Sequence, residues 1–293
     1  MSKTIASLIV DSLDIWTGAV ELKSGAGRGA GKRLNLYGLE RLRALVLDLA
    51  VRGKLVAQDD GDEDSATLLK KSVEQLEQLV DRGEIGRPRK ITKASGEPPF
   101  EIPKSWEWVQ IGQIGHDWGQ CEPQREFTYI DVGSIDQDLG LIRDPKVLGA
   151  SSAPSRARKI VRPGTVIYST VRPYLLNIAI IDRPFDPDPI ASTAFAIIHP
   201  FDGIEASFIY RYLRSPIFIK YVESCQTGIA YPAINDKQFF SAWFPLPPTC
   251  EQQRIVAKID EIFGLCDSLE AEMVGAAESQ KLLADAIVER AIA

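Results

Sequence analysis

Six basic side chains in residues 145–181 are the most distinctive chemical feature of the sequence. The stretch contains no aspartate or glutamate, although the whole chain has 34 Lys plus Arg against 40 Asp plus Glu and a net charge of −6. Basic side chains beside phosphates release counterions and give sequence-independent affinity. The segment therefore predicts contacts with the phosphates of a nucleic-acid backbone, the alternative being a solvated basic edge without a ligand. The predicted phosphate contacts are Lys146, Arg156, Arg158, Lys159 and Arg162.

Two loops carry side chains suited to reading base edges. The first follows an expected strand, turns at a proline and offers hydroxyls, a guanidinium and a phenol, which are donors and acceptors for the grooves of DNA. Its candidate residues are Ser169, Thr170, Arg172 and Tyr174, and for Tyr174 a place in the core is the alternative. The second loop spans residues 226–235, and Asn235 is placed to cap the element that follows. Its candidate residues are Thr227, Gly228, Tyr231 and Asn235.

Residue types for catalysis or metal binding do not fall into a working pattern. The four cysteines form no CxxC pair, and the two histidines, His116 and His199, do not complete a zinc set at normal spacing. The sequence has no GxSxG or P-loop motif. We therefore expect no catalytic residue, no metal and no cofactor in this chain. A glycine-rich loop at residues 23–32 contains a GxGxxA pattern, which leaves a nucleotide-binding enzyme as an alternative, but only within a βαβ unit.

The N-terminal part is predicted to be helical. After an N-terminal segment at residues 1–35, Leu39, Leu42, Val46 and Leu49 recur at spacings typical of an amphipathic helix, which Gly53 would end. An acidic turn follows, and Ser65 is expected to cap a second helix. The two helices predict a helical hairpin over residues 36–85. Four prolines then mark an extended linker at residues 86–105.

Residues 106–248 have the pattern of a mixed α/β (α+β) domain. Short β-branched and aromatic runs predict strands at residues 128–132, 165–169, 177–181 and 193–198, and an aromatic-rich stretch predicts one helix at residues 207–221. The proline-rich sequence FPLPP at residues 244–248 ends this domain, because proline stops both helices and ladders.

Residues 249–293 carry a heptad pattern that predicts a coiled-coil helix about 65 Å long. Its apolar seam alternates spacings of four and three and needs a partner helix. The seam residues are Ile255, Ile259, Ile262, Cys266, Leu269, Met273, Ala276, Gln280, Leu283 and Ile287. A coiled-coil scaffold with no DNA role is therefore a further alternative. The N-terminal apolar run is too short for a signal or membrane segment, which predicts a cytoplasmic protein.

Two sets of motifs resemble a known family. The sequence YGLERLR at residues 37–43, running into LAVRGKLV at 49–56, resembles the N-terminal conserved helix of the DNA-specificity subunit of type I restriction-modification enzymes. The FPLPP stop, followed by EQQRIV at residues 251–256 and LCDSLE at 265–270, is similar to that family's junction between a target-recognition domain and its conserved coiled-coil helix.

This resemblance implies a non-catalytic subunit that reads DNA. Family members usually carry two recognition domains, each reading one half of a bipartite site, whereas this chain resembles a half subunit with one. Two copies would then pair as a homodimer through the helical residues and read a palindromic site. The implied partners are the modification (methyltransferase) subunit and, through the complex, the restriction subunit, which use S-adenosylmethionine, ATP and Mg²⁺ for DNA methylation and host defence.

Overall fold

The structure is a computed structural model that describes residues 11–24, 32–87, 90–94, 96–225, 227–228 and 232–292. The chain divides into two compact units, one formed by Met1–Ala50 with Ala257–Ala293 and the other by Val51–Val256. The sequence predicts that residues 36–85 form one helical hairpin, whereas the boundary between the two units falls inside this range. Nearly all of α3 (Tyr37–Val51) falls in the first unit, and α4 (Ser65–Asp81) falls in the second. Across the described residues, no helix combines the length and the apolar character that crossing a bilayer requires.

The first unit contains α2 (Leu13–Gly18), α3, the hairpin of β1 (Glu21–Ser24) and β2 (Lys32–Asn35), and most of α8 (Thr249–Ile292). The long C-terminal helix is confirmed, with its start two residues before the EQQRIV motif. Residues 25–31 of the glycine-rich loop lie outside the described residues, but the strands on either side pair antiparallel. The two flanking strands therefore form a hairpin and not the βαβ unit that a dinucleotide-binding pattern requires, which disfavours the nucleotide-binding alternative.

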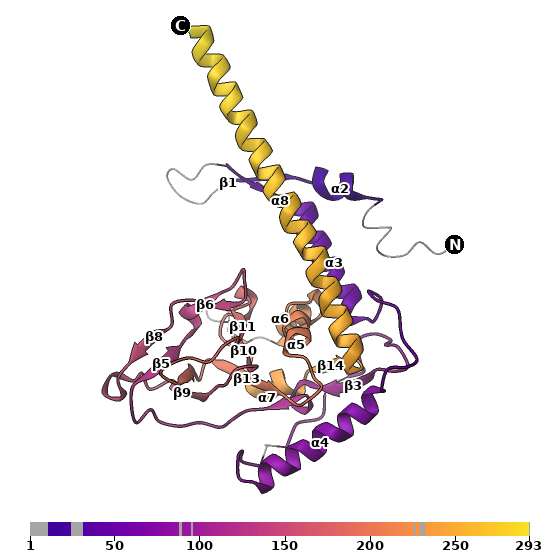
Figure 1. Ribbon diagram of the computed structural model, residues 1–293, viewed down its shortest axis with the longest axis vertical. Coiled ribbons are helices and arrows are strands. Elements are labelled where there is room, and N and C mark those ends of the chain that lie inside the picture. The colour runs from indigo at the N-terminus through magenta and orange to yellow at the C-terminus, as the bar shows by residue number, and fades with distance from the viewer. Residues whose placement is uncertain are drawn as a thin grey trace. The chain divides into compact units, whose positions relative to one another are not determined.

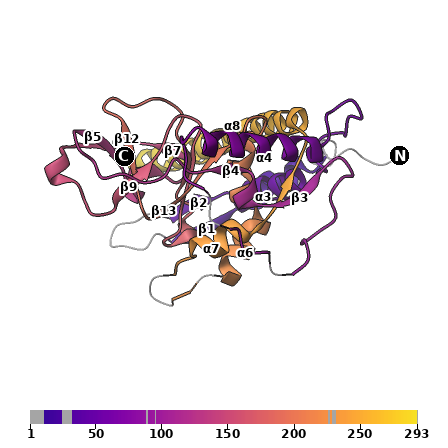
Figure 2. The same ribbon diagram turned by 90° about the horizontal axis from the view of Figure 1, so that it is seen from below.

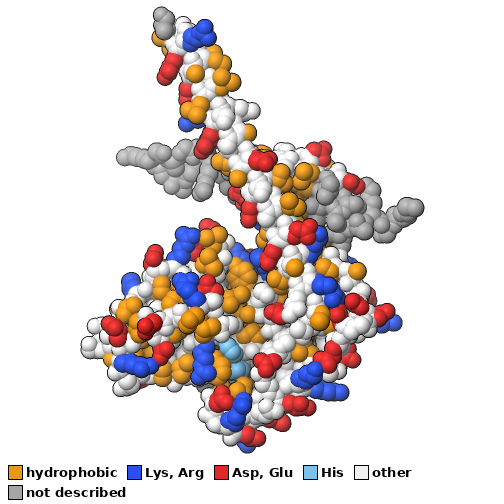
Figure 3. All heavy atoms as spheres, in the orientation of Figure 1, with side chains coloured by type: hydrophobic (Ala, Val, Ile, Leu, Met, Phe, Trp, Pro, Cys, Tyr) orange, Lys and Arg blue, Asp and Glu red, His pale blue; other side chains and the backbone are white. Residues whose placement is uncertain are grey.

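The predicted seam of α8 is covered along its first turns and bare along its last ones. Ile255, Ile259, Ile262 and Cys266 are buried, as are Leu39, Leu42 and Val46 of α3, whereas Leu49 and Leu269 are half-buried. Arg43 of α3 pairs with Asp267 at 2.6 Å and Glu270 at 3.0 Å on α8. The N-terminal helix therefore covers part of the seam within the same chain. Leu283 and Ile287 are exposed, and hydrophobic side chains (orange) line this end of α8 in Figure 3.

The second unit is built on two four-stranded sheets. The first has the order β11 (Ile178–Ile180), β10 (Val166–Ser169), β13 (Phe195–Pro200) and β4 (Gly115–His116), all antiparallel. The second has the order β8 (Lys146–Leu148), β5 (Phe127–Ile130), β12 (Pro189–Ser192) and β9 (Ala157–Ile160), with β5 and β12 parallel. Apolar residues of both sheets share one core. Helix α5 (Ala206–Leu213) packs against β10 and β11 (Figure 1). Figure 2 shows β5, β12 and β9 of the second sheet together at one side of this unit.

The structure confirms the mixed α+β class and the four predicted strands, with three local corrections. The helix predicted at residues 207–221 is two helices, α5 and α6 (Pro216–Cys225), because Pro216 has no N–H to continue the first. Helix α4 is capped by Asp64, whose carboxylate accepts from the Thr67 N–H at 2.8 Å, and Ser65 is buried inside the helix. Pro245 does not end a ladder but lies in β14 (Trp243–Leu246), which pairs with β3 (Glu107–Gln110) in a sheet of two strands among the described residues.

Candidate nucleic-acid interface

The first predicted loop is a rigid turn at the end of β10. It consists of a short 3-10 helix, η4 (Pro173–Leu175), between Arg172 at φ 48° and Leu176 at φ 51°. Two non-glycine residues in the left-handed region are unusual, and such strained backbone persists only where the surroundings fix it. Here the surroundings include the loop's own side chains. The Ser169 hydroxyl donates to the Val171 carbonyl at 2.8 Å, and the Thr170 hydroxyl donates to the Ala194 carbonyl at 2.9 Å.

These hydroxyl contacts add a structural role for two candidate residues. Ser169 is buried and donates its hydroxyl proton within the turn, and Thr170 is half-buried and donates its proton to the Ala194 carbonyl, which ties the turn to the start of β13. Both residues therefore shape the loop, and their hydroxyl oxygens can still accept a hydrogen bond, so the expected contacts with base edges stay predictions. Tyr174 is 51% exposed, so its alternative place in the core is wrong. Arg172 is exposed beside it.

The structure brings the two predicted loops together. The Arg172 N–H donates to the Pro232 carbonyl at 2.8 Å, and the Ile234 N–H donates to the Thr170 carbonyl at 3.0 Å. We call residues 169–176 with 227–228 and 232–235 the loop pair. Within the second loop, Thr227 and Ala233 exchange backbone hydrogen bonds at 2.9 and 3.0 Å. Gly228 has φ 89°, a conformation that favours glycine. Tyr231 lies outside the described residues.

Asn235 has the capping role expected from the sequence. Its side-chain oxygen accepts from the Gln238 N–H at 2.9 Å, and the Gln238 side chain accepts from the Asn235 N–H at 3.3 Å. This capping box begins α7 (Asp236–Ser241) and satisfies two backbone donors that the first turn of a helix leaves open. The cap fixes the end of the second loop.

The predicted phosphate contacts differ in how accessible they are. Lys146, Arg156 and Arg162 are exposed. Arg158 is half-buried and pairs with Glu122 at 3.1 Å, and Lys159 is buried on the inward face of β9. The exposed residues therefore remain the stronger candidates, because Arg158 must leave a carboxylate and Lys159 must turn outward to reach a phosphate.

A pair of histidines was not anticipated from the sequence. The register of β13 against β4 places His199 opposite His116, with ring centroids 5.3 Å apart and Trp118 packed against both. The Arg162 guanidinium lies 3.7 Å from the centroid of the Trp118 ring. Burial, then the charges of His116 and Arg162, lowers the pKa of His199 to about 4, and burial also lowers the pKa of His116. Both imidazoles are therefore neutral at pH 7.

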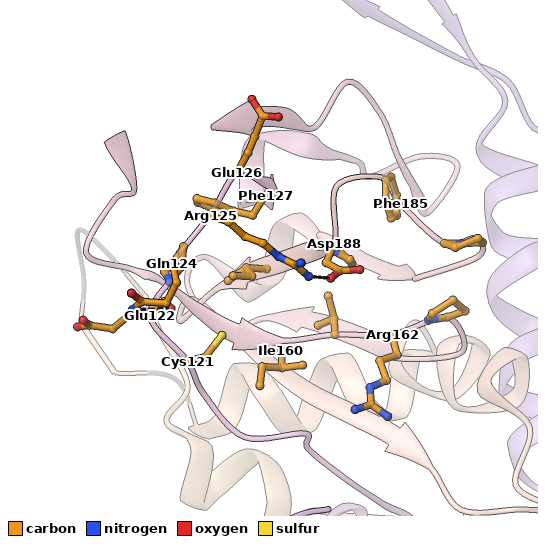
Figure 4. A pocket seen from close by; sticks show the side chains of 16 residues that line it. Cys121, Glu122, Gln124, Arg125, Glu126, Phe127, Ile160, Arg162, Phe185 and Asp188 are labelled. Atoms are coloured by element: carbon orange, nitrogen blue, oxygen red, sulfur yellow. Dashed lines mark hydrogen bonds and ion pairs between the residues drawn. The ribbon is translucent and has the colours of Figure 1, made fainter. Parts of the chain in front are cut away.

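A cavity of about 730 Å³ lies on the second unit, and Figure 4 shows the side chains that line it. Its walls combine Phe127, Phe185 and Ile160 with the side chain of Arg162. Arg125 points toward Asp188, at 2.5 Å, but both side chains are largely exposed, and such pairs hold little energy in water. Among the described residues no group of three or more His, Cys, Asp and Glu is placed to hold a metal ion.

The EQQRIV motif makes structural contacts within the second unit. The Glu251 carboxylate is buried and accepts from the Trp106 indole N–H at 2.8 Å and from Gln58. Burial raises the pKa of Glu251, although these donors oppose the shift. The buried Gln252 side chain donates to the Pro247 carbonyl at 2.8 Å and accepts from the Glu205 N–H at 2.8 Å. Arg254 pairs with Asp62 at 2.6 Å. These contacts fix the first two turns of α8.

The chain thus belongs to a class of proteins that combine an α+β domain with a long helix. The domain carries a basic segment and a rigid loop pair, and the helix carries a heptad seam. No family model matches the chain. It is 31% identical to the type I restriction enzyme EcoAI specificity subunit of Escherichia coli over 97% of this chain and 50% of that protein. It is 28% identical to the EcoEI specificity subunit of the same organism, over 97% and 49%.

Among solved structures, the HsdS subunit from Thermoanaerobacter tengcongensis is similar, with a TM-score of 0.57 and 35% identity, covering 64% of this chain and 49% of that one. The chain spans about half the length of the curated relatives it matches. The resemblance seen in the sequence is thus confirmed, and the chain is homologous to about half of a type I restriction enzyme specificity subunit.

Proposed function

We propose that this chain recognises a specific sequence in double-stranded DNA as the specificity subunit of a type I restriction-modification complex. The observation that carries the proposal is the loop pair, in which two separate candidate loops are hydrogen-bonded into one surface. That surface includes Arg172 and belongs partly to a segment with six basic residues and no acidic one. Exposed Lys146, Arg156 and Arg162 would hold phosphates, and the loop pair would face the bases.

In this proposal the chain supplies recognition and its partners supply the chemistry. A modification subunit would methylate DNA with S-adenosylmethionine, and a restriction subunit with ATP and Mg²⁺ would join through the complex. The chain itself would need no cofactor. Its place of action would be the cytoplasm.

The bare end of α8 supports pairing between two copies of the chain. Leu283 and Ile287 continue the heptad seam beyond the turns covered by α3, and an unpaired apolar seam of this kind needs a partner in water. A two-fold pair would present two recognition domains and read two inverted half-sites. A coiled-coil scaffold without a DNA role would also pair in this way. The two functions are therefore distinguished by a test of DNA recognition, which follows.

The test expresses the chain with its modification subunit and maps methylated bases across the host genome. We expect one bipartite, inverted motif that is absent when the chain is omitted. Purified complex should then bind a duplex carrying that motif, with an affinity that falls steeply as salt rises. A matched duplex with a scrambled motif is the control. Methylation that does not depend on the chain, together with equal binding to both duplexes, would refute the proposed function.

A further inference from the structure

The turn of the first loop, which we call the tip, carries exposed apolar side chains. Tyr174 and Leu175 on η4 and Val171 beside it are all exposed, whereas Pro173 is buried beneath them. Large apolar side chains gathered at the tip of a loop are unfavourable in water unless a ligand covers them. The tip is therefore unlike a loop that reads bases only by hydrogen bonds.

The tip is also held firmly in shape. The Leu175 N–H donates to the Arg172 carbonyl and the Leu176 N–H to the Pro173 carbonyl, both at 3.0 Å. At its far end, the Arg214 guanidinium donates to the carbonyls of Leu176 at 3.4 Å and Gln137 at 2.9 Å. Helix α6 packs against η4. A tip fixed in this way loses little conformational freedom when it binds.

Charge and size indicate what covers the tip. Arg172 begins the turn, and the tip lies in the segment that has six basic residues and no acidic one, which suits a phosphate-lined groove. A stable protein interface buries about 800 Å² on each partner, far more than three side chains on one short turn can supply. Apolar side chains inserted between base pairs, by contrast, work singly or in pairs.

We propose that Tyr174 and Leu175 act as a wedge that enters the DNA helix and unstacks neighbouring base pairs. The inference rests on the proposed function and adds a way of reading DNA to it, because the energy of unstacking depends on the base step. The ring of Tyr174 and the side chain of Leu175 replace stacking between the bases, and Arg172 holds the adjoining phosphate. The Tyr174 hydroxyl is not needed for the wedge.

The experiment uses the chain in complex with its modification subunit, without S-adenosylmethionine, on duplexes carrying the mapped motif. 2-Aminopurine, whose fluorescence rises when it unstacks, replaces one base at a time outside the methylated bases. We expect a rise at one step of each half-site. Changing Tyr174→Ser with Leu175→Ser should return that signal to the value of the free duplex. Tyr174→Phe should keep it, and Val73→Ser, at an exposed apolar residue of α4, is the matched control.

Three outcomes would overturn the wedge and are distinguishable from failure of the proposed function. Specific binding without a fluorescence rise at any step refutes the wedge alone. Loss of the signal with Tyr174→Phe shows that the hydroxyl reads a base edge instead. Loss of the modification subunit from the Tyr174→Ser, Leu175→Ser complex shows that the tip contacts protein. If the parent complex binds no DNA, the proposed function fails together with the wedge.

Discussion

Replacing the exposed seam residues at the end of α8 with alanine should weaken the pairing of two chains without changing the stability of the single chain. Leu283 and Ile287 are 64% and 61% exposed, so changing both to alanine removes little that stabilises the single chain. In a paired helix the same side chains are covered. Burying a whole leucine or isoleucine contributes about 1.5–3 kcal/mol, and the exposed share of each therefore contributes about 1–2 kcal/mol.

Four such side chains in a two-fold pair give about 4–7 kcal/mol, which corresponds to a rise of roughly a thousandfold or more in the dissociation constant. The assay is sedimentation velocity over a concentration series, with thermal melting to follow folding. We expect the Leu283→Ala, Ile287→Ala variant to be monomeric at concentrations where the parent is dimeric, with an unchanged melting temperature at low concentration.

The chain offers a matched control at the neighbouring positions. Leu282 and Val288 are 70% and 55% exposed but lie off the heptad seam, so Leu282→Ala with Val288→Ala removes similar apolar area without facing the partner. This variant should pair as the parent does. Equal dissociation of both variants would refute pairing by the seam, and a parent that stays monomeric at micromolar concentration would refute pairing altogether.

Three further predictions follow from single contacts. Changing Arg156 and Arg162 to alanine should weaken binding to the motif duplex and to the scrambled duplex equally, and it should reduce the slope of log affinity against log salt by about 2. A loss of affinity for the motif duplex alone would contradict a phosphate role. Because the pKa of His199 is about 4 rather than 6.5, its stabilising effect is complete above pH 6.5 and is lost as the pH falls toward 4, by about 1–2 kcal/mol after a discount for exposure. Urea unfolding of His199→Gln against the parent should show a weaker pH dependence in that window, and parallel curves would disprove the assignment. Gln252→Leu leaves two backbone groups without partners and should cost about 2–4 kcal/mol in urea unfolding, whereas Gln253→Leu, at an exposed position, should cost under about 0.5 kcal/mol.

Local patterns predicted the elements, because an element's type depends on residues close together in the chain. The β-branched and aromatic residues of β10 predict a strand, and the heptad spacing of α8 predicts a helix. Charge counting was less successful, since it treats every basic residue as exposed. Lys159 lies on the inward face of β9, and that orientation follows from strand alternation within a sheet whose register the sequence does not reveal.

The arrangement of the loop pair and of the two histidines could not be predicted from the sequence, because it depends on contacts between segments far apart in the chain. The hydrogen bond from Ile234 to Thr170 and the approach of His199 to His116 both join segments far apart in the chain. No local signal marks such partners, because they are selected by packing of the whole domain. The packing of α3 over the start of the seam, where Ile259 is buried, could not be predicted from spacing for the same reason. A heptad seam indicates that a partner helix is needed, but it does not indicate which helix is the partner.

The EQQRIV motif, which resembles the related subunits, has a structural role. A resemblance carried by such residues predicts the fold and class of the protein, but it does not predict the DNA sequence that the protein would read. Glu251, Gln252 and Arg254 hold the start of α8 through buried hydrogen bonds and an ion pair, so nearly any substitution there leaves a partner unsatisfied. Arg172 and Tyr174 are exposed at a loop tip whose backbone is fixed by other residues. Their side chains are therefore free to differ between proteins without loss of the fold. A motif-based resemblance thus predicts the class of subunit, whereas under the proposed function the exposed side chains of the loop pair would determine which DNA sequence is read.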